Sequence, residues 1–263
     1  MKKVLVCFAL MAGISVDGSA QIKVGGKKID TKKIVGAATD VANAITLSDA
    51  DVAKISREYV EWMDAHNEVA GPDTELGQRL QQLTSGIKIE GLDLNFKVYN
   101  VLDVNAFACG DGSIRVCGGL MHVMEDAEVL AVIGHEIGHV VHTDSKNAMK
   151  NAYLSSAAKN ALTATEGTMQ KLTDSDLGSL AQALSSAQYS QKQEYAADDY
   201  AFDFCVKNGV DPYGMADALD KLVEMSNAGG EKASSIQKMF STHPDSEKRA
   251  ARMREKADKH TGK

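Results

Sequence analysis

Five consecutive residues, His135-Glu136-Ile137-Gly138-His139, have the types and spacing for metal-dependent hydrolysis. On an α-helix, His135 and His139 are four residues apart, so their side chains lie on one face, one turn apart. Two neutral imidazoles at this spacing can bind one zinc ion, and Glu136 beside them can take a proton from the water that zinc activates. The motif predicts a hydrolytic metal centre. The alternative is an amphipathic helix that carries two histidines by chance.

The segment around the motif favours the metal centre. It is apolar on most of its circumference, which is typical of a buried helix, and Asp126-Ala127-Glu128 supplies acidic residues for the first turn. A buried Glu136 is costly unless a cation compensates it. Gly134 and Gly138 each weaken a helix interior by about 1 kcal/mol relative to alanine. We interpret them as positions where a substrate or a neighbouring element comes close.

A catalytic zinc ion needs a third protein ligand as well as an open position for water. Glu194 and Asp198 are four residues apart on an expected helix over 190–207, so they share one face. Glu194 would be the ligand, and Asp198 would accept a hydrogen bond from a zinc-binding histidine. Glu166 is a competing ligand in polar surroundings. On its own, Glu-x-x-x-Asp more often marks a solvated helix face.

His243 is followed by Pro244, between two expected helices. Because proline favours an extended conformation in the residue before it, His243 could hold its imidazole towards the metal centre. A donor there would stabilise the oxyanion that forms when water attacks a carbonyl. The alternative is a surface or core histidine without a role in catalysis.

The N-terminus has the pattern of a secretory signal peptide. Met1-Lys2-Lys3 is positive, residues 4–16 are apolar, and Gly18-Ser19-Ala20 offers small residues for cleavage. The apolar run is short for a membrane span, so an uncleaved anchor is the weaker alternative. We expect a periplasmic or secreted protein with a signal peptide over 1–20, an N-terminal extension over 21–47 and one domain over 48–263.

Composition limits the class of protein. The chain has 263 residues, 44% of them hydrophobic, and a net charge of −7. It can bury one sizeable core, and without a long basic run it is not expected to bind nucleic acid. Three cysteines lie beyond the signal peptide, namely Cys109, Cys117 and Cys205. An odd number of cysteines cannot all pair internally, so we favour free thiols.

Hydrophobic periodicity predicts a mostly helical α+β domain. A small sheet is expected beside the zinc helix, with a hairpin turn at Asp111-Gly112 and with its edge strand before that helix. The expected strands are Asn95–Val101, Asn105–Cys109 and Ser113–Val116. The expected helices are Ser48–His66, Thr74–Thr84, 126–150, a helical pair within 151–188, 190–207, 213–227 and 246–259.

Several segments together resemble the zinc endopeptidase family that includes the CAAX-prenyl proteases and the heat-shock protease HtpX. They occur in the order of that family: Asp103–Ala108, Ile114–Val116, Gly119–Met121, Val132–Val140, Ser190–Glu194, Ala197–Tyr200, and His243-Pro244 followed by Arg249. The resemblance implies a gluzincin-type fold with one zinc ion per chain on His135, His139 and Glu194, and with Glu136 as general base.

The resemblance also implies roles around the metal. Asp198 would support a zinc-binding histidine, His243 would stabilise the oxyanion, and the strand Asn105-Ala106-Phe107 would line the substrate cleft. The substrates would be proteins or peptides, either misfolded or from the cell envelope, which add to the exposed strand edge. Peripheral contact with a membrane stays open, since the chain lacks the cysteine after the signal that often carries a lipid anchor in this branch.

A rival function from another class is a metal-bound chaperone-like or scaffolding protein of the cell envelope that does not cleave its clients. A general base at Glu136 argues against it, because scaffolding needs no base.

Overall fold

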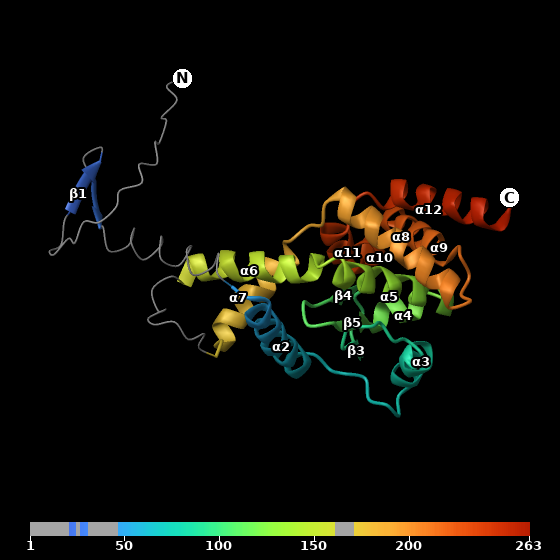
Figure 1. Ribbon diagram of the computed structural model, residues 1–263, viewed down its shortest axis with the longest axis horizontal. Coiled ribbons are helices and arrows are strands. Elements are labelled where there is room, and N and C mark those ends of the chain that lie inside the picture. Colours follow the sequence, from blue (N-terminus) through green and yellow to red (C-terminus); the bar gives the residue numbers. More distant parts are fainter. Residues whose placement is uncertain (1–20, 25–26, 31–46, 161–170) are drawn as a thin grey trace, which may run out of the picture.

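The computed structural model describes residues 21–24, 27–30, 47–160 and 171–263 (Figure 1). The expected signal peptide over 1–20, most of the extension over 21–47, and Glu166 lie outside the described residues. Within these ranges, none of the helices has both the length and the apolar character that crossing a membrane would need.

The predicted α+β, mostly helical fold class is confirmed. The helices are α2 (Asp49–His66), α3 (Glu75–Thr84), α4 (Gly118–Val123), α5 (Asp126–Val141), α6 (Asp144–Asn160), α7 (Asp174–Ser185), α8 (Gln191–Lys207), α9 (Gly214–Ala228), α10 (Gly230–Ser235), α11 (Gln237–Thr242) and α12 (Ser246–Thr261). The strands are β1 (Gln21–Val24), β2 (Lys27–Asp30), β3 (Asn95–Tyr99), β4 (Ala106–Ala108) and β5 (Ser113–Cys117).

The sheet beside α5 has the order β3-β5-β4. Strand β5 pairs in parallel with β3 and antiparallel with β4, so β4 is an edge strand that pairs on one side only among the described residues. The predicted turn at Asp111-Gly112 connects β4 to β5. Gly112 has a φ of 91° there, and a side chain would meet the Asp93 carbonyl. Strands β1 and β2 form a separate antiparallel pair.

Helix α2 is fixed to this sheet by a buried ion pair. Arg115 on β5 is 1% exposed and donates from Nε and Nη2 to the Asp64 carboxylate at 2.8 and 3.0 Å. Lys97 and Tyr99 on β3 also donate to Asp64, at 2.7 and 2.8 Å. Burial raises the pKa of Asp64, but these hydrogen bonds lower it to about 2.

The single helix that the sequence predicts over 126–150 is wrong. Helix α5 ends at Val141 and α6 begins at Asp144, because Thr143 adopts the left-handed region with a φ of 63°. A β-branched residue rarely adopts this conformation, so the break does not show in the hydrophobic pattern. The break turns the chain and allows α6 to pack against α7 and α2 instead of continuing α5.

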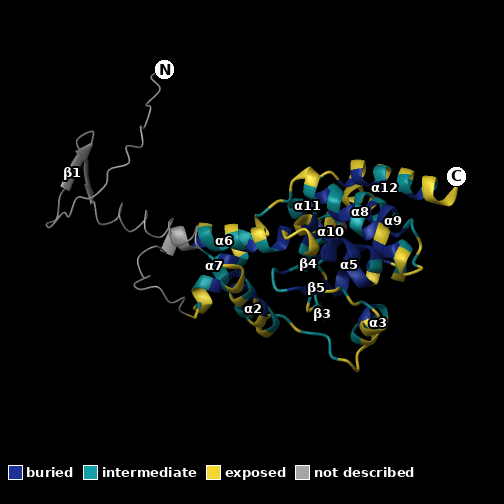
Figure 2. Ribbon diagram, viewed as in Figure 1, coloured by how far each residue is buried: buried dark blue, intermediate teal, exposed yellow. Residues whose placement is uncertain are grey.

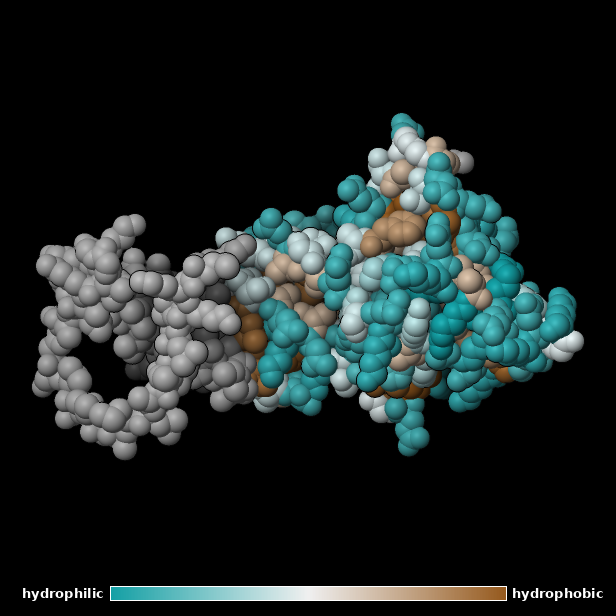
Figure 3. Space-filling model, turned by 90° about the horizontal axis from the view of Figure 1, so that it is seen from above, coloured by the Kyte–Doolittle hydropathy of each residue, from teal (hydrophilic) through white to brown (hydrophobic). Residues whose placement is uncertain are grey.

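The described residues contain two hydrophobic cores. The larger core surrounds α5 and takes side chains from the sheet, α8, α9 and α12; Figure 2 shows α5 buried in its middle. The smaller core joins α2, α6 and α7 and reaches the sheet through Phe107 and Cys109. Helix α12 lies on the outside, and the surface on its side is mostly hydrophilic (Figure 3).

Candidate active site

Helix α5 carries the motif in its buried part. Its first turn is fixed by a capping box, in which the Glu128 side chain accepts from the Glu125 backbone N–H at 2.7 Å. Two turns later, His135, Glu136 and His139 are at most 2% exposed. Three ionisable side chains so deep in a protein need partners or an ion.

The two glycines of the motif helix allow α8 to come close. A Cβ at Gly138 would lie 3.0 Å from the Ala197 Cα, and one at Gly134 would lie 2.8 Å from the Phe204 ring. The neighbouring element that the glycines predict is therefore α8. Because α8 packs at backbone distance, it can bring Glu194 from its first turn to the histidines of α5.

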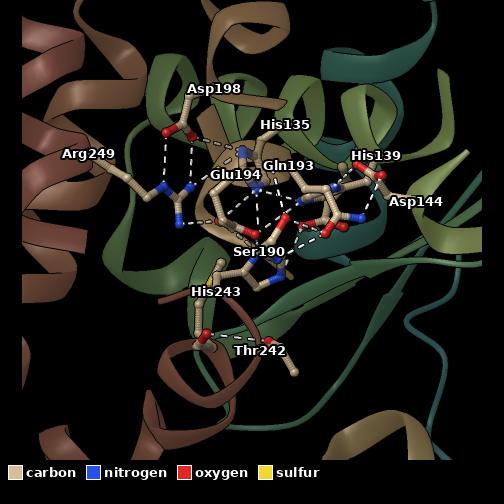
Figure 4. Close-up of polar contacts among 12 residues, drawn as sticks. His135, His139, Asp144, Ser190, Gln193, Glu194, Asp198, Thr242, His243 and Arg249 are labelled. Carbon is tan, nitrogen blue, oxygen red and sulfur yellow. Dashed lines mark hydrogen bonds and ion pairs between the residues drawn. The ribbon is translucent and has the colours of Figure 1, made fainter. Parts of the chain in front are cut away.

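Four side chains converge on one point (Figure 4). His135 Nε2 and His139 Nε2 are 3.1 Å apart, and they lie 3.6 and 3.4 Å from the two oxygens of Glu194. His243 Nδ1 lies 3.1 Å from Glu194 Oε1. One ligand atom from each of the four residues lies within 4.8 Å of the ligand atoms of the other three, and all four residues are buried. The structure thus brings together the three predicted ligands and His243.

Further buried contacts hold the ligands from behind. Asp198 Oδ1 accepts from His135 Nδ1 at 2.9 Å, as the sequence predicts for this carboxylate. Arg249 on α12 donates to both oxygens of Asp198 at 2.9 and 2.7 Å and also pairs with Glu194. On the other side, Asp144 Oδ2 lies 3.1 Å from His139 Nδ1.

Electrostatics keeps these carboxylates ionised. Burial raises the pKa of Glu194, but His243, His139 and His135 together hold it well below its usual range. Burial likewise raises the pKa of Asp198, and hydrogen bonds from Arg249 and His135 lower it to about 2. Two negative carboxylates that contact buried imidazoles form a cluster suited to binding a cation.

Glu136 and His243 face each other across the open side of the cluster. His243 Nε2 lies 3.7 Å from Glu136 Oε1, and this oxygen is buried without a hydrogen-bond partner among the described residues. The Tyr189 N–H donates to the Thr242 carbonyl at 3.1 Å and so fixes the residue before His243. The Tyr189 ring also stacks on the His139 ring at 3.9 Å between centroids.

A cleft of about 1080 Å³ opens at this point. Glu136 and His243 lie in its wall together with the whole of β4 and the residue before it. Its opposite wall comes from α2, α6 and α7, hence from the smaller core. The predicted substrate-binding residues Asn105, Ala106 and Phe107 therefore line the same cavity as the predicted base. Asn105 Oδ1 is buried there without a hydrogen-bond partner in the described part of the chain.

Sequence reasoning missed some residues and left others open. Arg249 belongs to the resembling segments, but the sequence assigns it no role. The helix over 246–259 is rich in charged residues, and the sequence does not indicate which of its arginines is buried. Asp144 was missed since a continuous helix would turn it away from His139. The three thiols are free and buried, as favoured above.

Comparisons with known proteins agree with one another. Residues 71–257 match the model of peptidase family M48. The chain is 37% identical over 230 residues to the metalloprotease YcaL of Escherichia coli K12, which covers 87% of this chain and 88% of YcaL. It is 36% identical over 250 residues to the metalloprotease LoiP of the same organism, with 94% and 96% covered. A protease HtpX homologue of Methanopyrus kandleri is 29% identical over 180 residues, with 57% and 55% covered.

Proposed function

The chain belongs to peptidase family M48, and from this premise we propose that His135, His139 and Glu194 bind its zinc ion. As a member of this family it is a zinc-dependent metalloendopeptidase that acts on protein or peptide substrates. The resemblance to the family that contains HtpX is confirmed, and the rival scaffolding function is not supported.

The residues fit the metal. Two imidazole nitrogens and one carboxylate are the donor set of many catalytic zinc sites. Here they meet in a buried cluster whose carboxylate is held in its charged form. The orphaned Glu136 Oε1 is the observation that carries the assignment of the base, because a buried carboxylate oxygen without a partner is costly unless a ligand uses it.

We assign one chemical role to each remaining side chain. Zinc, when bound, supplies Lewis acidity, which acidifies water and polarises a carbonyl. Glu136 takes the proton from the water that attacks the scissile carbonyl and later gives it to the leaving amine. His243 donates a hydrogen bond to the developing oxyanion. Asp198 accepts from His135 Nδ1 and thereby fixes the tautomer of that histidine.

The substrate would bind as an added strand. Strand β4 is at the edge of the sheet and its residues line the cleft, and main-chain hydrogen bonds to an edge strand accept many sequences. This mode suits unfolded or misfolded chains, since only an extended segment can pair with the edge. We propose quality control of envelope proteins as the role, in the periplasm after cleavage of residues 1–20, with any membrane contact peripheral.

Cleavage of unfolded casein, with and without a chelator, tests the activity and its metal. Glu136→Gln should retain zinc but lose about 10²–10⁴-fold in rate, because only the base is removed. Full activity of this variant would contradict the assignment of the base. Mass spectrometry of the protein from its host should find an N-terminus near Gln21, and an intact Met1 or a lipid adduct would contradict the proposed location.

A further inference from the structure

The two zinc-binding histidines of α5 differ in what holds them. His135 is supported by Asp198, from a motif that the sequence already suggests. His139 is supported by Asp144, five residues further along the chain. On a continuous α-helix, five residues correspond to a rotation of about 500°, which turns the two side chains about 140° apart. They meet only because Thr143 breaks the helix with its φ of 63°.

Asp144 is itself a fixed, buried acceptor. Its side chain is 8% exposed. Oδ2 lies 3.1 Å from His139 Nδ1, and Oδ1 accepts from Gln193 Nε2 at 2.7 Å. Gln193 is the residue before Glu194 on α8, so one carboxylate connects the second histidine to the helix that carries the third ligand. Figure 4 shows this connection on the side of the cluster opposite Arg249.

The geometry determines the tautomer of His139. An ionised carboxylate only accepts hydrogen bonds, so Nδ1 must carry the proton that it shares with Asp144. In the neutral imidazole, which is the form that binds a metal, Nε2 then presents its lone pair, and this is the atom that lies 3.1 Å from His135 Nε2 and 3.4 Å from Glu194 Oε1. The stacked Tyr189 ring prevents rotation of the imidazole out of this plane.

We propose that Asp144 is a positioning residue for the metal site, which holds His139 in the tautomer and orientation that bind zinc. The left-handed Thr143 serves this contact. The inference rests on the proposed function, because it takes His139 as a ligand. It adds a carboxylate that neither the motif nor its spacing identifies.

The test measures zinc affinity by competition with a chromogenic chelator, not turnover. Asp144→Ala should bind zinc about 10–100-fold more weakly, as expected when the acceptor of a ligand histidine is lost. Asp144→Asn retains an acceptor oxygen and the start of α6, and it should lose less than about tenfold. The Nδ1 proton of His139 should give a protected NMR signal in the native zinc form, shift in Asp144→Asn and disappear in Asp144→Ala.

Asp126→Ala is the matched control. Asp126 is the first residue of α5 as Asp144 is of α6, and it pairs with Arg79 at 2.7 Å while touching no proposed ligand. Its zinc affinity should stay within about twofold of the native value. If Asp144→Ala fails to fold, Asp144→Asn decides the question. An Asp144→Asn variant with native affinity and an unchanged His139 signal would overturn the proposal.

His139→Ala separates this proposal from the one on which it rests. If His139→Ala binds zinc like the native protein, the ligand set is wrong. If His139→Ala loses zinc while the folded Asp144 variants bind it normally, only the role of Asp144 is refuted.

Discussion

Replacing Gly138 by alanine tests how closely α8 must approach the zinc helix. The new Cβ would lie 3.0 Å from the Ala197 Cα and 3.2 Å from the Ala197 carbonyl oxygen. Non-bonded carbon atoms are comfortable at about 3.5–4.0 Å, so α8 would have to move by a few tenths of an ångström. Backbone atoms cannot turn aside as the end of a side chain can, so the whole first half of α8 would shift, and Glu194 with it.

The cost of overpacking at Gly138 can be separated from the gain in helix propensity by comparison with a second glycine. Gly178 lies inside α7, and a Cβ there would meet nothing within 4 Å. Gly178→Ala should therefore gain the helix propensity of alanine, up to about 1 kcal/mol. Gly138→Ala gains the same term but adds an overpacking cost of about 1–3 kcal/mol. The two variants should differ by about that cost in the free energy of unfolding, with Gly138→Ala the less stable.

Urea unfolding of both zinc-free variants measures this difference, and a chelator competition measures zinc affinity. Ligand distances in a metal site tolerate only about 0.2 Å, so Gly138→Ala should also bind zinc about tenfold more weakly or worse. Gly178→Ala should bind it normally. If Gly138→Ala is as stable as Gly178→Ala and keeps its zinc, the close approach of α8 does not position Glu194.

Three further predictions concern separate parts of the molecule. His243→Ala should lower kcat more than it raises KM in peptide hydrolysis, because an oxyanion donor acts mainly in the transition state; a change in KM alone would make His243 a substrate contact. Glu194→Ala should lose most of its zinc, whereas Asp198→Ala should lose about 10–100-fold in affinity; full zinc stoichiometry in Glu194→Ala would refute the third ligand. The folded pKa of Asp64, about 2, lies below its ordinary value of 3.8, so its stabilisation is complete above that value and is lost as the pH falls towards 2. Asp64→Asn should remove about 1–2 kcal/mol at pH 7 and flatten this acid dependence in urea unfolding, while an unchanged profile would contradict the role of the ion pair.

The sequence predicts the helices and strands whose signals are local. Ser48, Thr74 and Ser190 each cap the helix that they were expected to start or precede, and their side chains accept from a backbone N–H three residues on. The apolar residues Phe96 and Val98 alternate with polar neighbours and predict β3, whereas β5 is buried at all five positions and shows no alternation in burial. The short helices α4, α10 and α11 were not predicted, because six residues are too few to establish a period.

The residues of the site divide in the same way, into those that a local sequence pattern predicts and those that only tertiary contacts bring together. His135, Glu136 and His139 follow from helix geometry alone, since all three lie within two turns. Glu194 is 55 positions beyond His139, and its approach depends on a helix contact that Gly138 permits but does not specify. Asp144 requires a backbone conformation at Thr143 that threonine disfavours, so contacts distant in sequence, such as the packing of α6 against α2 and α7, must stabilise it. Local patterns thus predict the motif, and tertiary packing supplies the carboxylate that supports it.

The two hydrophobic cores imply that two parts of the domain differ in their free energy of local unfolding. The cleft has the larger core on one side and the smaller core of α2, α6 and α7 on the other. A fluctuation that unfolds only the smaller core would widen the cleft and leave the zinc helix and α8 packed. Amide protons of α6 and α7 should then exchange with deuterium through a cheaper, partial unfolding, while those of α5 should exchange only when the whole domain unfolds. Such a difference in local stability would admit a bulky unfolded chain at a fraction of the free energy of global unfolding.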